Sequence, residues 1–269
     1  VAHVVTQCAT GAAARGRTDV AAGGAAHGAT DHVAARCAQR AAVGRFATLA
    51  LVGTQGTAGS AAQAGSTVLL LDAQEGAARK AAAAIVAQWD KLVEKGRLDP
   101  AQRDAYATQL QPVEALSALE GCDLVVEAIV EKLDVKRQLF KDLEDIVAPD
   151  AVLATNTSSL SVTAIGAGLR HPGRFAGFHF FNPVPLMKVV EVVAGFKTEA
   201  AVCERLREYA RQMGHSAVLA QDTPGFIVNH AGRGYGTEAL RIVGEGVADF
   251  ATIDRILKDQ AGFKLGPFE

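Results

Sequence analysis

One histidine and one glutamate stand at a spacing that suits proton transfer. His179 ends a predicted strand (175–179), and Glu191 lies twelve residues later on the next predicted strand (188–193). Histidine suits a general base because its ordinary pKa is near neutral. A carboxylate on the other ring nitrogen fixes the tautomer and stabilises the imidazolium. If the second strand returns beside the first, the pair can take a proton from a substrate hydroxyl. A core histidine beside an unrelated surface glutamate is the alternative interpretation.

Apolar runs of strand length alternate with helical periodicity from residue 48 to residue 221. Predicted strands cover 48–52, 67–71, 124–130, 152–155, 175–179, 188–193 and 217–220, and predicted helices cover 75–95, 133–146 and 199–213. This alternation indicates α/β architecture, a Rossmann-type doubly wound and mostly parallel sheet with helices on both faces. In such a sheet ligands collect beyond the carboxyl ends of the strands, where His179 falls.

A glycine-rich turn follows the first predicted strand. Gly53, Gly56 and Gly59 form the pattern GxxGxxG, and Asp72 ends the second strand 19 residues after Gly53. Glycine allows a tight turn and the close approach of a pyrophosphate to a helix N-terminus. An acid about 20 residues after the first glycine holds the adenosine ribose hydroxyls and repels a ribose phosphate. The sequence therefore predicts NAD as the cofactor. The pattern departs from GxGxxG, so a chance arrangement of glycines is the alternative.

Composition argues against several classes of protein. The net charge of −2 leaves no basic surface for nucleic acid. The sequence contains no run of about 18 apolar residues, so we expect no membrane-spanning helix. The cysteines lie far apart and include no CxxC pair, so we expect neither a disulfide scaffold nor a metal site, and a cytoplasmic location is predicted. These cysteines are Cys8, Cys37, Cys122 and Cys203.

Three segments differ in composition and pattern. Residues 1–47 are rich in alanine and glycine and contain no leucine or isoleucine, so this atypical segment is not expected to fold alone. A targeting segment or a misread N-terminal sequence would each account for it. Residues 48–221 form the predicted NAD-binding domain. After Asp222 the pattern is helical, and residues 222–269 are predicted to begin an all-α C-terminal domain.

Over residues 48–269 the chain resembles the 3-hydroxyacyl-CoA dehydrogenase family. The segments that carry the resemblance are LVVEAIVE (124–131), ATNTSSLSVTAI (154–165), GFHFFNPVPLMKVVEVV (177–193) and DTPGFIVNH (222–230). The resemblance implies NAD-dependent oxidation of (S)-3-hydroxyacyl-CoA to 3-ketoacyl-CoA, in fatty-acid β-oxidation or related acyl-CoA metabolism. It makes His179 the general base and Glu191 the residue that orients it. His230 departs from the family, which usually has arginine at that position.

The same resemblance implies roles for further polar residues near the substrate. Ser158 and Asn229 match family residues around the substrate hydroxyl, and Lys95 matches a lysine that meets coenzyme A. Ordinary structural roles are the alternatives. Serine and asparagine often serve in turns and helix caps, and basic residues often end helices because they complement the helix dipole.

Three more residues match family positions beside the cofactor. Glu131 and Lys136 correspond to residues near the ribose and nicotinamide, and Asn182 corresponds to a residue near the nicotinamide and the substrate hydroxyl. A solvated helix start is the alternative for the first two. Asn182 precedes a proline, so a turn role remains its alternative.

The resemblance also bears on partners. An acyl-CoA is the expected ligand, and a homodimer is expected when the C-terminal domain is complete, because the family forms its dimer contact there. A structural or cofactor-binding member, similar to the lens crystallins of this family, is the alternative to an enzyme. The altered glycine turn favours that alternative. The set His179, Glu191, Ser158 and Asn229 favours the enzyme.

Overall fold

The computed structural model describes residues 48–52 and 56–269. The predictions for residues 1–47 and for Gly53 lie outside this described part. Its centre is an eight-stranded sheet in the order β3-β2-β1-β4-β5-β6-β7-β8. The strands are β1 (Thr48–Val52), β2 (Thr67–Leu71), β3 (Leu110–Pro112), β4 (Leu124–Glu127), β5 (Val152–Thr155), β6 (Phe175–Phe180), β7 (Val189–Ala194) and β8 (Ser216–Gln221).

Most neighbouring strands run parallel. Strands β1 to β6 share one direction, whereas β7 pairs antiparallel with β6 and parallel with β8. The loop between β6 and β7 therefore begins and ends at the edge of the sheet where β6 has its carboxyl end. The predicted Rossmann-type, mostly parallel fold is confirmed.

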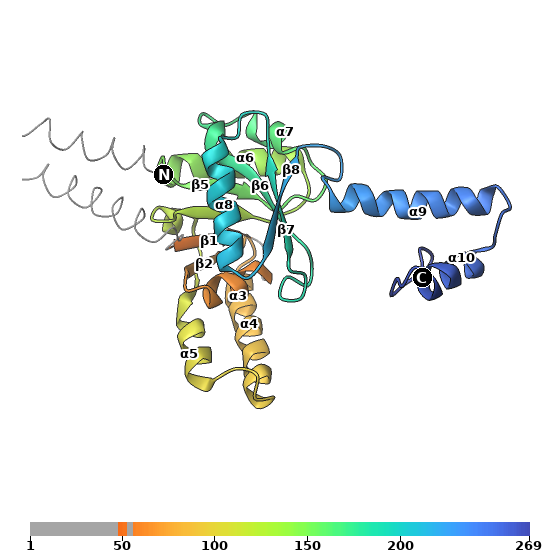
Figure 1. The fold of residues 1–269 in the computed structure, drawn as a ribbon. Helices are drawn as coiled ribbons and strands as arrows, with labels where there is room; N and C mark the ends of the chain where they lie inside the picture. The colour runs from red at the N-terminus through yellow and green to blue at the C-terminus, as the bar shows by residue number, and fades with distance from the viewer. Residues whose placement is uncertain (1–47, 53–55) are drawn as a thin grey trace, which may run out of the picture.

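Helices cover both faces of this sheet, as Figure 1 shows. Helices α3 (Gly56–Gln63), α4 (Ala77–Glu94) and α8 (Ala200–Gln212) contribute buried residues to the core cluster on one face, and α6 (Leu133–Ile146) and α7 (Val162–Gly166) contribute to the cluster on the other. Helix α5 (Pro100–Gln109) packs on α4. Short 3-10 turns form η1 (Leu116–Leu119) and η2 (Pro172–Arg174), and α9 (Val228–Gly244) leads away from the sheet to α10 (Phe250–Asp259).

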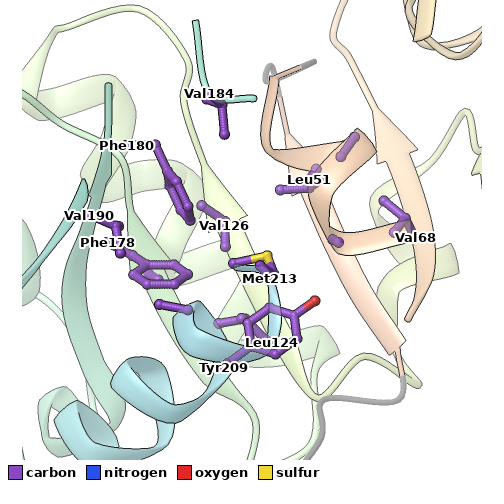
Figure 2. Packing of buried hydrophobic residues seen from close by; sticks show 14 of the residues in the cluster. Leu51, Val68, Leu124, Val126, Phe178, Phe180, Val184, Val190, Tyr209 and Met213 are labelled. Carbon is purple, nitrogen blue, oxygen red and sulfur yellow. The ribbon is translucent and has the colours of Figure 1, made fainter. Parts of the chain in front are cut away.

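The larger core cluster joins the sheet to α8. Leu51, Val126 and Phe178 from three strands meet Tyr209 and Met213 at the end of α8 (Figure 2). All five side chains are buried, with exposed fractions of 6% or less. Burial of large apolar side chains is the main favourable term in folding, so this packing fixes the strand ends that carry the site. No helix in the described ranges is long and apolar enough to cross a bilayer.

Strands β3 and β4 differ from the sequence prediction, and helix α7 was not predicted. Strand β4 ends at Glu127 and not at residue 130, because the buried Glu127 carboxylate accepts the N–H of Ile129 at 2.6 Å and turns the chain out of the sheet. Strand β3 was not predicted, since its three residues carry no apolar run. It pairs in parallel with β2 at the sheet edge, and its one apolar side chain that is buried, Leu110, joins the larger core cluster.

Candidate active site

The antiparallel pairing of β6 and β7 places His179 opposite Glu191. The imidazole Nδ1 lies 2.7 Å from the Glu191 Oε2 atom. Both side chains are buried, with exposed fractions of 4% and 0%. Because Nδ1 faces the carboxylate, it carries the N–H, and Nε2 is the ring nitrogen that can accept a proton.

The second oxygen of Glu191 binds the start of α9. Its Oε1 atom accepts the N–H groups of Ile227 and Val228, each at 2.9 Å. Gly225 and Phe226 turn the chain into this position with φ values of 78° and 49°. A β-carbon at Gly225 would lie 3.0 Å from the backbone nitrogen of His230. Glycine therefore suits this turn because of its positive φ and because of the close approach. Glu191 thus links His179 to helix α9, which follows the sheet.

Two aromatic rings border the His179 imidazole. The Phe181 ring centroid lies 4.5 Å from that of His179, and the Phe226 centroid lies 5.7 Å from it. Phe226 is the non-glycine residue with positive φ among the described residues, a conformation that costs free energy and is often retained at functional sites. These rings restrict the imidazole to the plane that Glu191 selects.

Glu131 organises the turn that carries Ser158. Its Oε1 accepts the Ser158 N–H at 3.1 Å, the Ser159 N–H at 3.2 Å and the Ser159 hydroxyl at 3.1 Å, and it also accepts the Thr157 hydroxyl. The backbone carbonyl of Ser158 accepts a hydrogen bond from the Asn229 side-chain amide at 3.4 Å. Ser158, Asn229 and Glu131, all predicted site residues, therefore lie together.

Lys136 lies beneath this turn and is fully buried. Its Nζ binds Glu127 Oε1 at 2.5 Å, Glu131 Oε2 at 3.1 Å and the Ile129 carbonyl at 3.2 Å. An ammonium has three N–H donors, and these contacts use them inside the protein. In this arrangement Lys136 has no N–H left for the predicted contact with a cofactor. We therefore infer that Lys136 positions Glu131.

The pKa of Glu131 is lowered to about 2. Partial burial acts in the opposite direction, but the hydrogen bond from Thr157 and the charge of Lys136 outweigh it.

This shift predicts a pH-dependent contribution to stability. A carboxyl with a lowered folded-state pKa stabilises the fold above its ordinary pKa, and that contribution is lost as the pH falls through the folded-state value. Glu131→Gln should therefore lower the free energy of unfolding, and this loss should have its full size above pH 4.5. The difference from wild type should shrink as the pH falls towards 2. Urea unfolding at a series of pH values measures it. Glu120→Gln, at an exposed position, is the control, and a difference that is constant across this range would contradict the assignment.

A cavity of about 730 Å³ opens beside the carboxyl ends of β4, β5 and β6. Helices α3 and α4 form one side of it and the loop 182–186 forms the other. It is lined by three of the predicted cofactor residues, Gly56, Gly59 and Asn182. A β-carbon at Gly56 would lie 2.8 Å from Val184 Cγ2, so the start of α3 approaches the loop as closely as glycine permits.

The remaining predicted residues, Asp72 and Lys95, do not line this cavity. Asp72 directly follows β2, and its Oδ1 accepts the Gln74 N–H at 2.9 Å. Lys95 is exposed at the C-cap of α4, three residues beyond Leu92, which lines the cavity. Sequence reasoning assigned no role to Glu127 or Thr157. A charged residue inside the apolar run LVVEAIV is the signal that marks Glu127, whereas no sequence signal marks Thr157.

Comparison with protein-family models places both parts of the chain. Residues 50–223 match the NAD-binding domain of 3-hydroxyacyl-CoA dehydrogenase, and residues 225–269 match its C-terminal domain. The chain belongs to the 3-hydroxyacyl-CoA dehydrogenase family. The predicted family and the predicted cofactor, NAD, are thereby confirmed, and at the level of the family so is the prediction of an NAD-dependent oxidoreductase.

Individual family members resemble the chain over most of its described length. 3-Hydroxyadipyl-CoA dehydrogenase of Escherichia coli is 44% identical over 227 residues, covering 82% of this chain and 48% of that protein. The human mitochondrial hydroxyacyl-coenzyme A dehydrogenase is 40% identical over 220 residues, covering 80% of this chain and 70% of that protein. The chain thus spans about half the length of the first relative and about two thirds of the second.

Solved structures of the family share the fold. A 3-hydroxybutyryl-CoA dehydrogenase of Escherichia coli superposes with a TM-score of 0.80 at 43% identity, covering 82% of this chain and 48% of that one. The (S)-3-hydroxybutyryl-CoA dehydrogenase of Ralstonia eutropha superposes with a TM-score of 0.79 at 31% identity, covering 82% and 80%.

Proposed function

We propose that this member of the family oxidises (S)-3-hydroxyacyl-CoA to 3-ketoacyl-CoA with NAD, in fatty-acid β-oxidation or related acyl-CoA metabolism. The contact of 2.7 Å between His179 Nδ1 and Glu191 Oε2 carries the proposal. It provides a buried base with its tautomer already selected, at the end of the sheet where Rossmann domains bind their cofactors.

The described residues fit NAD. The start of α3 has glycine at positions 56 and 59, and a β-carbon at either would meet a neighbouring side chain within 3.4 Å. Gly56, Gly59 and Asn182 would hold the pyrophosphate and nicotinamide side of the cofactor, and Asp72 would hold the adenosine ribose. When bound, NAD supplies the nicotinamide ring that accepts the hydride from C3 of the substrate.

Proton transfer is the part that the chain performs. The substrate hydroxyl gives its proton to His179 Nε2 as the C3 oxygen becomes a carbonyl. Glu191 stabilises the resulting imidazolium through Nδ1, and its contacts with the Ile227 and Val228 amides keep the carboxylate in place while the charge develops.

Ser158 and Asn229 would orient the substrate. They lie within one hydrogen bond of each other, one after β5 and the other on α9, so they approach a substrate from two parts of the chain. Their side chains can bind a hydroxyl or carbonyl without competing for the proton. Lys95, exposed at the end of α4, would meet a phosphate of coenzyme A.

Two measurements test this function. Acetoacetyl-CoA should be reduced with loss of NADH absorbance, and NADH fluorescence should change as protein is added. Binding of NADH without turnover of acetoacetyl-CoA would leave the structural or cofactor-binding alternative. Absence of both would reject the proposal.

Asp72 should determine the choice between the two dinucleotides. Asp72→Ala should weaken NAD binding by about tenfold, since hydrogen bonds to the ribose hydroxyls are lost, and should strengthen NADP binding because the repulsion of its phosphate disappears. Dissociation constants for both cofactors decide the matter. Glu75→Ala, at an exposed position just after Asp72, is the matched control. A wild type that binds both cofactors equally would place Asp72 away from the ribose.

The cytoplasmic location and the homodimer remain part of this proposal. Cys122 and Cys203 are buried free thiols, as suits a reducing compartment. Burial raises the pKa of Cys122 to about 12 and raises that of Cys203, which makes both thiols poor nucleophiles. Cell fractionation would test the location, and size-exclusion chromatography with light scattering would test the dimer.

A further inference from the structure

His215 is a buried histidine outside the catalytic pair. It lies between α8 and β8 with 3% of its surface exposed. Its backbone N–H donates to the Ala210 carbonyl at 2.9 Å, and its ring meets the Phe180 ring edge-on, with centroids 5.5 Å apart. The backbone turn and this ring contact together leave the imidazole one orientation.

Both ring nitrogens of His215 face carbonyl oxygens. Nδ1 lies 3.1 Å from the Met213 oxygen, and Nε2 lies 3.2 Å from the Val184 oxygen. Carbonyl oxygens only accept hydrogen bonds, so a ring N–H at Nε2 is the donor in the contact with Val184. The Met213 contact is local to the turn. The Val184 contact spans 31 residues and reaches the loop between β6 and β7.

Val184 transmits this contact to the cofactor cavity. Its side chain is 3% exposed and lies with Phe180 and Val126 at one end of the core cluster in Figure 2. The same side chain limits the space at Gly56, where a β-carbon would lie 2.8 Å from Val184 Cγ2. The position of Val184 therefore sets the distance between the loop 182–186 and the start of α3.

We propose that His215 is a positioning residue for dinucleotide binding. Its Nε2–H holds the Val184 carbonyl, and this contact keeps the loop 182–186 at the correct distance from Gly56. His215 touches neither cofactor nor substrate and acts through Val184. The inference rests on the proposed NAD-dependent function, and it adds to the cofactor site a residue that lies 31 positions later in the chain than Val184.

Three substitutions separate the two nitrogen positions. His215→Gln keeps an N–H donor near the Nε2 position, which reaches Val184. His215→Asn keeps a donor near the Nδ1 position, which reaches Met213 only. His215→Phe keeps the ring against Phe180 and removes both ring nitrogens. Asn and Gln are therefore matched polar controls for each other, and Phe is the control for packing.

Trp89 gives a direct readout of the cavity. It is the single tryptophan of the sequence, it is 4% exposed, and it lines the cavity opposite the loop 182–186. Acrylamide quenching of its fluorescence in the ligand-free protein reports the loop position independently of any activity. Titration with NADH, followed at the same residue, gives the dissociation constant.

Asn and Phe at position 215 should each weaken NADH binding about tenfold and raise the quenching constant about twofold, because the Val184 hydrogen bond is lost. Gln should stay within about twofold of wild type in both measurements. The turnover number at saturating NADH should change less than about threefold in all three variants, so the loss appears in KM. Equal behaviour of Gln and Asn, or wild-type values in Phe, would overturn the inference. Wild-type protein that binds NADH without turning over acetoacetyl-CoA would reject the proposed function and leave the quenching comparison valid.

Discussion

His179→Gln should lower the turnover number by about 10²–10⁴-fold, because general-base catalysis contributes about that much. Glutamine retains a polar group that can meet Glu191 but cannot take a proton. The dissociation constant for NAD should stay near its wild-type value, since His179 contacts Glu191 and the rings of Phe181 and Phe226 and does not line the cofactor cavity. Steady-state kinetics and an NADH titration on the same preparation measure the two quantities.

His171→Gln is the matched control for this variant, because His171 is exposed at the start of η2. It should leave both quantities unchanged. The pair can also be tested as a unit: adding Glu191→Gln to His179→Gln should cost little more than His179→Gln alone, because residues that act together are not additive. Near wild-type turnover in His179→Gln would reject His179 as the base.

Lys136→Met should reduce the free energy of unfolding by about 3–5 kcal/mol, the cost of removing one partner from a buried ion pair. The substitution removes one ammonium group that binds two carboxylates. Its nitrogen lies 2.5 Å from the fully buried Glu127 and 3.1 Å from Glu131. Two carboxylates would then share one site without a compensating charge. Urea unfolding at pH 7 measures the change.

Two further variants separate charge from packing at this position. Lys141→Met lies on the same helix but at an exposed position, so it should change stability little. Combining Lys136→Met with Glu127→Gln should recover part of the loss, because the uncompensated buried charge is removed. If the double variant is less stable than Lys136→Met, the ion pair does not account for the effect.

Glu191 connects His179, the proposed base, to helix α9. One oxygen faces His179, and the other accepts two backbone amides at the start of α9. Helix α9 also carries Asn229, which binds Ser158. A displacement of α9 would therefore disturb both the Glu191 contact with His179 and the contact between Asn229 and Ser158, even if the sheet itself did not change.

Local patterns in the sequence were enough to determine the architecture. Apolar runs and helical periodicity are set by burial on the two faces of a sheet, so β1, β2, β5 and α6 appear at or within one residue of their predicted bounds. The spacing of His179 and Glu191 allowed their pairing and the family resemblance predicted it, whereas the antiparallel return that sets the two residues opposite each other came from the structure.

Tertiary structure alone decided how the charges inside the site are paired. The sequence predicted Lys136 and Glu131 as cofactor residues, with a solvated helix start as the alternative. In the structure Lys136 is fully buried, because Glu127, at the end of β4, and the Ile129 carbonyl also bind its ammonium group. His215 carried no sequence signal, since its partner Val184 lies 31 residues away. Such contacts depend on where strand ends and loops meet in space. A local pattern fixes which face a residue occupies, but the partner that satisfies a buried charge or N–H comes from whichever distant segment the fold places beside it.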